Sequence, residues 1–170
     1  MLFKGLPPLL SGIKDGKTKW QQLDNVDFEK IGHFLSSHLV IEHYMEKYIS
    51  AYSPAPFNWE GAGLTFNQKI ILMSGLKHFP EPFNIPPVLK HLNSVRNKLS
   101  HKIDFELSDE HLLPIRQFIS KTTKPEAGLS DGDFESTLST FTMLVCAYFA
   151  SAITYCEEQK ANNRNGNWVL

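Results

Sequence analysis

Apolar side chains recur every three or four residues over most of the chain, which is the period of an amphipathic helix. The clearest stretch begins at Asp24 and ends before Pro54 and Pro56, because proline cannot continue a helix. The residues on this one face are Phe28, Ile31, Leu35, Leu39, Glu42, Met45 and Ile49. The pattern predicts a long helix over residues 24–52, with the Glu42 carboxylate at the centre of its apolar stripe.

Four further helices are predicted from start signals and periodicity. Thr65 followed three residues later by Gln68 is a capping box, and Ser108 is a second N-cap residue. A pair of prolines at 86 and 87 suits the first turn of another helix. The predicted ranges are 65–76, 88–102, 109–120 and 133–159.

No stretch shows sustained alternation of apolar and polar residues, so the pattern favours an all-α fold. We expect a bundle of about five helices, with the long helices 24–52 and 133–159 packed antiparallel. The chain then divides into a flexible Gly/Pro/Lys-rich arm over 1–22, a single domain over 23–161 and a polar tail over 162–170.

Composition narrows the function classes. The chain has 170 residues, enough for one domain with its own core. Its net charge of −1 excludes a globally basic coat protein, so any nucleic-acid site must be a local patch. The two cysteines, Cys146 and Cys156, lie about 15 Å apart along one predicted helix and cannot bridge there. This usage fits a reducing compartment and predicts a cytoplasmic protein.

The segment Ser136–Cys156 is uncharged over 21 residues, long enough to raise the question of a membrane. Seven of its residues are Ser or Thr, and its flanks are acidic at Glu135, Glu157 and Glu158. Because positive flanks are missing, we expect a buried core helix and no membrane association.

The predicted helix 88–102 has an unusual charge pattern. Between Pro82 and Ile103 the chain has no acidic residue. The bases there are Lys90, Arg96, Lys98 and Lys102, with His91 and His101 beside them. Such a local patch favours a phosphate-bearing ligand. The alternative is a solvated helix face whose charges pair with the acids that follow it.

Spacing within this helix suggests a chemistry. Asn97 and His101 are four residues apart and share a face, whereas Arg96 and His101 are separated by about 140° and about 7.5 Å. One helix makes a poor pocket, but a second copy related by a two-fold axis would bring two Arg–His pairs into one cleft. A neutral imidazole can then take the proton of a ribose 2′-hydroxyl, and a guanidinium can stabilise the phosphorane.

The Arg-Asn-x-x-x-His run at the end of this basic helix resembles the Arg-x(4–6)-His motif of the HEPN superfamily. The runs LVIEHYMEKYI and LTFNQKI also resemble the mannitol operon repressor-like branch, which carries the same motif without an established nuclease role. The resemblance covers residues 34–107. It implies an all-α, dimeric domain, in many members a metal-independent ribonuclease of toxin–antitoxin or antiphage systems.

Carried over by position, the resemblance makes Arg96 and His101 the catalytic pair and Asn97 an orienting residue. Lys98, Lys102 and Lys90 would hold phosphates of RNA, and Glu42 would support the pair from the first long helix. Competing structural roles are a surface salt bridge for Arg96, a helix C-cap for His101 and a buried ion pair for Glu42.

Other chemistry finds little support in the sequence. His38 and Glu42 are four residues apart, but no matching pair elsewhere has metal-ligand spacing, so no metal and no cofactor is expected. Three classes remain open: a HEPN-type endoribonuclease, a regulatory or adaptor protein, and a nucleotide-binding sensor. The expected partners are RNA or a nucleotide, a second copy of the chain, and an antitoxin or regulatory protein.

Overall fold

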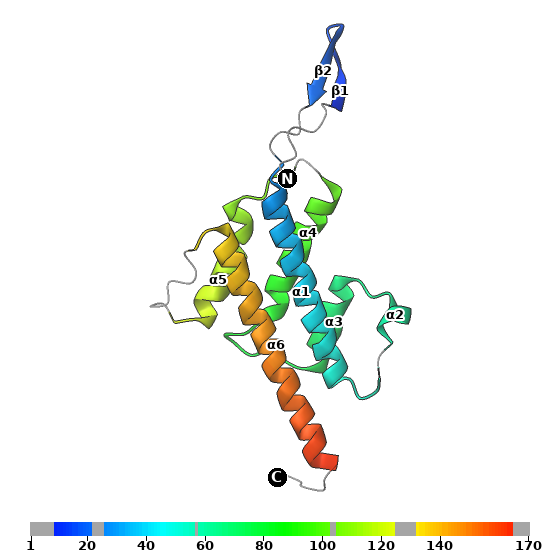
Figure 1. The fold of residues 1–170 in the computed structure, drawn as a ribbon, viewed down its shortest axis with the longest axis vertical. Coiled ribbons are helices and arrows are strands. Elements are labelled where there is room, and N and C mark those ends of the chain that lie inside the picture. The colour runs from blue at the N-terminus through cyan, green and yellow to red at the C-terminus, as the bar shows by residue number, and fades with distance from the viewer. Residues whose placement is uncertain (1–8, 22–25, 57, 103–104, 125–131, 165–170) are drawn as a thin grey trace.

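Two long helices, α1 (Phe28–Tyr52) and α6 (Phe134–Arg164), lie side by side along the length of the molecule (Figure 1). The computed structural model describes residues 9–21, 26–56, 58–102, 105–124 and 132–164. The remaining elements are β1 (Leu9–Lys14), β2 (Lys17–Gln21), α2 (Trp59–Ala62), α3 (Phe66–Leu76), α4 (Ile85–His101), the 3₁₀ turn η1 (Asp109–Leu112) and α5 (Leu113–Thr122). Within these residues five helices have ten residues or more, which confirms the all-α bundle.

Local signals fixed several helix starts as predicted. The Thr65 side chain accepts a hydrogen bond from Gln68 N at 3.3 Å, and Gln68 Oε1 accepts one from Thr65 N at 2.8 Å, which completes the capping box of α3. The prolines at 86 and 87 occupy the first turn of α4. At the far end, α6 continues to Arg164, so the predicted polar tail begins later than expected, and residues 165–170 lie outside the described residues.

The prediction that the two long helices pack antiparallel is wrong. His33 Nε2 lies 3.2 Å from Ser139 Oγ near the start of both helices, and Tyr52 Oη donates to Ala152 O at 3.1 Å further along both. The contacts follow the same order in each helix, so α1 and α6 are parallel. Antiparallel packing follows from short connections. Here the connection holds α3, α4 and α5, and it is long enough to return the chain to the end where α1 began.

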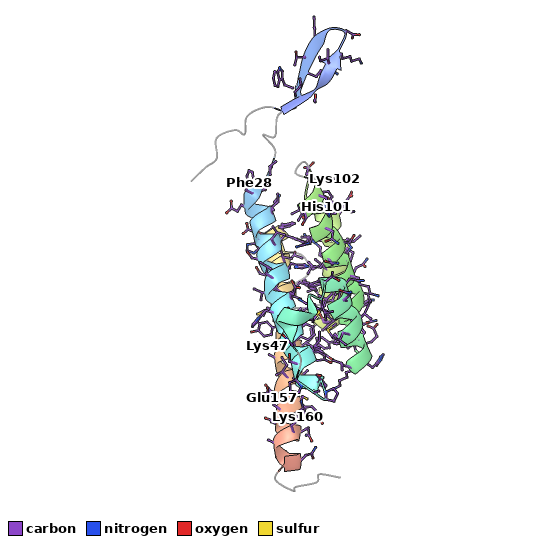
Figure 2. All side chains as sticks on the ribbon, turned by 90° about the vertical axis from the view of Figure 1, so that its right-hand side faces the viewer. Phe28, Lys47, His101, Lys102, Glu157 and Lys160 are labelled. Atoms are coloured by element: carbon purple, nitrogen blue, oxygen red, sulfur yellow. The ribbon has the colours of Figure 1, made fainter. Side chains whose placement is uncertain are left out.

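The helices α3 and α4 cover one side of α1, while α5 packs against α4 and α6. Figure 2 places Phe28, at the start of α1, at the same end of the bundle as His101 and Lys102, at the end of α4. The two helices therefore run in opposite directions. The core between the elements is apolar and aromatic, and Tyr48 stands at its centre with ring centroids 4.6 Å from Tyr52 and 5.2 Å from Phe149.

The apolar segment 136–156 forms the middle of α6. By length and composition α6 is the one described helix that could cross a membrane. Its apolar face is buried against α1 and α5, including Leu138, Phe141, Val145 and Phe149, which are fully buried. One face of α6 therefore belongs to the core, as predicted, but only 33% of its most apolar window is buried among the described residues, and Met143 is 64% exposed.

Part of the flexible arm predicted over residues 1–22 is a hairpin of β1 and β2, so the prediction of no strands is wrong for this segment. Asp15 and Gly16 have φ of 54° and 70°, the positive pair that a two-residue type I′ turn requires. The Asp-Gly pair was the available signal. An irregularity in the register between Leu10 and Gly12 interrupts the alternation that would otherwise mark the strands.

Candidate phosphate-binding face of helix α4

Helix α4 is amphipathic, and its polar face points away from the core. The buried side chains Ile85, Val88, Leu89, Leu92 and Val95 fix it against the rest of the bundle. The opposite face carries the basic residues, so burial of the apolar stripe dictates that these side chains are exposed.

A shallow open depression of about 440 Å³ lies on this exposed face. Its lining residues are Lys90, Asn93, Ser94, Asn97, Lys98, His101 and Lys102. Five residues predicted for the site therefore share one surface. Every lining residue belongs to α4 or its C-cap, so in a single protomer a ligand would be contacted from one side only.

Arg96 lies on the flank of α4, outside the lining of this depression. Its Nη1 lies 3.4 Å from Asn97 Oδ1, which accepts a hydrogen bond from it. Within the described residues no hydrogen bond joins Arg96 to His101, in keeping with their separation around the helix. The structure thus groups Asn97 and His101 together and places Arg96 beside them.

The charges of this face are open to solvent. Lys90, Arg96, Lys98 and Lys102 are all exposed, and the ion pairs among the described residues include none of the four. Lys98 Nζ lies 5.7 Å from the centroid of the Phe105 ring, a cation–π contact that leaves its charge uncompensated. Of the acids that follow the helix, Asp104 lies outside the described residues, and no ion pair of the described residues joins Glu106, Asp109 or Glu110 to these four cations.

His91 contributes to packing rather than to the patch. It is half-buried, and its Nε2 donates to His111 O at 2.7 Å, because a carbonyl oxygen can only accept. The ring of His111 in turn accepts a hydrogen bond from Ser108 N at Nδ1, 3.2 Å away. The pair ties α4 to the start of η1.

Glu42 is held in an ion pair that crosses from α1 to α3. Lys69 Nζ donates to Glu42 Oε1 at 2.6 Å and also to a Glu46 carboxylate oxygen. Burial disfavours the charge of Lys69, but the hydrogen bonds and charges of the two carboxylates outweigh it and raise the pKa of the ammonium group. The structural alternative for Glu42 was a buried acid in an ion pair; the ion pair with Lys69 is present, but Glu42 is half-buried, with 23% of its side chain exposed.

His38 is a residue whose position the sequence did not reveal. It is 3% exposed, its ring lies 4.1 Å from that of Phe66, and its Nδ1 is 3.9 Å from Glu42 Oε2. Burial lowers the pKa of the His38 imidazole; Glu42 and Asn93 oppose this shift, and the charges of Arg96 and Lys69 add to it. Arg96 is therefore close to the polar network of α1 and α3. The one available signal was the spacing of His38 and Glu42, four residues apart on one face.

A larger groove than the depression on α4 lies elsewhere on the described residues. A groove of about 760 Å³ between the second halves of α1 and α6 is bordered by Lys47, Glu157 and Lys160, which Figure 2 shows at the end of the molecule opposite His101. No residue predicted for the site lies in it. Among the described residues no group of three or more His, Cys, Asp or Glu side chains is placed to hold a metal ion.

No protein-family model matches the chain, and no curated protein or solved structure is significantly similar to it.

Proposed function

We propose that this protein is a metal-independent endoribonuclease of the HEPN type, whose active site forms where two copies bring their α4 helices together. The observation that carries the proposal is the exposed face of α4. Asn97, His101 and three lysines share one open depression there, and Arg96 stands at its edge. A histidine base and a guanidinium beside unpaired cations are the groups that phosphodiester cleavage without a metal needs.

The second copy supplies what one protomer lacks. Arg96 stands outside the depression with its guanidinium hydrogen-bonded to Asn97, and His101 lies in the depression. Antiparallel apposition of two α4 helices about a two-fold axis places Arg96 of one copy opposite His101 of the other. The depression then gains an opposing wall and twice the positive charge.

The reaction needs only these side chains. Neutral His101 accepts the proton of a ribose 2′-hydroxyl, whose oxygen attacks the adjacent phosphorus. Arg96 stabilises the charge that develops on the phosphorane, and Asn97 orients the guanidinium through the hydrogen bond between them. The bond from phosphorus to the 5′-oxygen breaks, and this oxygen takes a proton from water while His101 returns its proton to the solvent. The products are a 2′,3′-cyclic phosphate and a 5′-hydroxyl end.

The direct test incubates the purified protein with end-labelled RNA in excess EDTA. We expect cleavage that His101→Ala reduces by about 10² to 10⁴. His78→Ala is the matched control, because His78 is also exposed but lies on the loop after α3. RNA cut equally fast by His101→Ala, or products with 3′-hydroxyl ends, would refute the mechanism and favour the regulatory or adaptor class.

A mixing experiment tests the shared site. Arg96→Ala and His101→Ala are each expected to be inactive alone. In a mixed dimer one of the two composite sites keeps both groups, so random exchange should restore about a quarter of the wild-type rate. No recovery after exchange, or a monomer by light scattering at micromolar concentration, contradicts the shared site.

A further inference from the structure

The hairpin of β1 and β2 has two chemically different faces. The register pairs Leu10 with Trp20 and Ile13 with Thr18, and it pairs Lys14 with Lys17. Because side chains alternate along a strand, Trp20 and Thr18 lie on one face with Leu10 and Ile13. Lys14, Lys17 and Lys19 occupy the other face.

This segregation depends on the break in register. Leu10 and Ile13 are three residues apart and would point to opposite faces of a regular strand. The extra residue between Leu10 and Gly12 brings both apolar side chains to the same face. Gly12 has a φ of 147°, a conformation that side chains other than glycine rarely adopt. The bulge therefore builds the apolar face.

Nothing in the described residues covers that face. Leu10 is 57% exposed, Ile13 73% and Trp20 60%. In Figures 1 and 2 the hairpin stands apart from the bundle, beyond the first turn of α1. An isolated two-stranded hairpin is marginally stable in water, so an exposed tryptophan and two exposed aliphatic side chains on it indicate a surface that binds something.

The charge of the hairpin indicates what binds. Residues 9–21 contain three lysines and one aspartate, whereas the whole chain has a net charge of −1. The lysines lie on the face opposite Trp20, but the ribbon has only two strands about 4.8 Å apart, so a nucleic-acid strand that stacks on the ring can pass around one edge and bring its phosphates to the lysine side chains. A polyanion with planar bases can stack on Trp20 and hold its phosphates against these ammonium groups.

The point of attachment adds the connection to α4. From Gln21 to Val26 is five residues, which span at most about 18 Å. Val26 leads directly into α1, and the start of α1 lies at the same end of the bundle as His101 and Lys102 (Figure 2). Chain length alone thus keeps Gln21 within about 18 Å of Val26, at the end of the bundle where α4 also ends.

We propose that the hairpin is a second RNA-binding site, which holds single-stranded RNA where the strand leaves the α4 face, with Trp20 as its stacking residue. The inference rests on the proposed function for its choice of ligand, and it extends the substrate to a single strand longer than the cleaved step. If the apolar face instead inserted into lipid or docked on a second copy of the chain, the emission of Trp20 would respond to vesicles or to protein concentration rather than to RNA.

The experiment uses the full chain with Trp59→Phe and Trp168→Phe, so that Trp20 is the one tryptophan. His101→Ala is added to prevent cleavage. Titration with a 20-nucleotide polyuridine should quench the emission of Trp20, and titration with a 4-nucleotide RNA should bind far more weakly. In a parent chain that carries only His101→Ala, Trp20→Ala should weaken binding of the 20-mer by about 5- to 150-fold, the range for loss of one stacked base.

The controls separate the ligands and the two proposals. Trp20→Phe keeps a ring at this position and should bind RNA within a few-fold of the parent chain. Tyr155→Ala removes a similarly exposed ring from α6 and should bind RNA as the parent chain does. Equal affinity of Trp20→Ala and the parent overturns the inference. The inference is also overturned if the emission of Trp20 changes with vesicles of phosphatidylglycerol and phosphatidylcholine, or with protein concentration, but does not change with RNA. Cleavage without quenching refutes only the hairpin, and quenching without cleavage refutes only the nuclease.

Discussion

Lys69 Nζ donates a hydrogen bond of 2.6 Å to Glu42 Oε1 and so joins α3 to the middle of α1. A second carboxylate, Glu46, accepts from the same ammonium group. The side chain of Lys69 is 9% exposed, and those of Glu42 and Glu46 are 23% and 31% exposed. The base is thus nearly buried and the acids are half-buried, so removal of the base leaves two acids facing each other with little water to screen them.

Lys69→Met should therefore destabilise the fold while keeping the aliphatic stem. Loss of hydrogen bonds to charged groups costs about 1.5–3 kcal/mol, and we expect a decrease in the free energy of unfolding within that range, measured by urea denaturation at pH 7. Lys47→Met is the control, because Lys47 is an exposed lysine of α1. Since the pKa of Lys69 is raised, the stability it confers is present below its unfolded pKa and is lost as pH rises through the folded one. An unfolding free energy for Lys69→Met equal to that of the wild type contradicts this role.

His38 predicts a pH dependence at the acidic end. Its pKa is lowered in the fold, chiefly by burial, so the unfolded chain binds the proton first as pH falls below about 6.5. Stability should then decrease with falling pH until the folded pKa is passed, by at most about 1.4 kcal/mol per pH unit from this one group. His38→Phe keeps a ring against Phe66 and should remove this part of the slope.

Urea denaturation at pH 7.5, 6.5 and 5.5 measures the effect. His78→Gln, which changes an exposed histidine, should leave the slope between pH 7.5 and 5.5 as in the wild type. An unchanged slope in His38→Phe would show that Glu42 and Asn93, which favour the protonated ring, compensate for its burial.

Helix starts and the buried face of α4 could be predicted because the information is local. The face predicted for α1 is partly wrong: Phe28 and Leu39 of the predicted stripe are exposed, and Phe34, Ile41 and Tyr48 are buried instead. The capping box of α3 lies within four residues, and the apolar stripe of α4 lies within one helix. The lysines, Asn97 and His101 were grouped correctly for the same reason: one exposed helix face carries them all.

The features that could not be predicted depend on contacts between residues distant in sequence. Glu42 and Lys69 are 27 residues apart, and no spacing rule within α1 identifies the partner. The proximity of Arg96 to His38, and the parallel direction of α1 and α6, likewise follow from how three intervening helices return the chain. The two strands of the hairpin could not be predicted because the bulge interrupts the alternation of apolar and polar residues that marks a strand.

Arg96→Lys should be a poor enzyme although it keeps the charge. The planar guanidinium can donate to Asn97 and to a phosphate oxygen together, whereas an ammonium group is a point charge without that fork. Loss of a donor that stabilises a transition state costs about 10² to 10³ in rate, and Arg96→Gln should fall in that range with Arg96→Lys recovering only part. Single-turnover cleavage of a labelled RNA measures it, with Arg116→Lys on α5 as control. Full activity of Arg96→Lys would reduce the role of Arg96 to charge alone.

Lys98→Ala separates binding from chemistry. Lys98 is exposed on the α4 face, and its Nζ rests near the ring of Phe105 rather than against an acid. Each phosphate contact adds about 0.7 to the slope of log affinity against log salt for a single strand. Lys98→Ala should therefore weaken RNA binding at low salt and lower this slope by about 0.7, while single-turnover cleavage at saturating RNA stays close to wild type. Lys121→Ala removes an exposed lysine of α5 outside the face and should change neither quantity. If both variants changed the slope equally, the attraction would come from net charge, and α4 would hold no localised phosphate site.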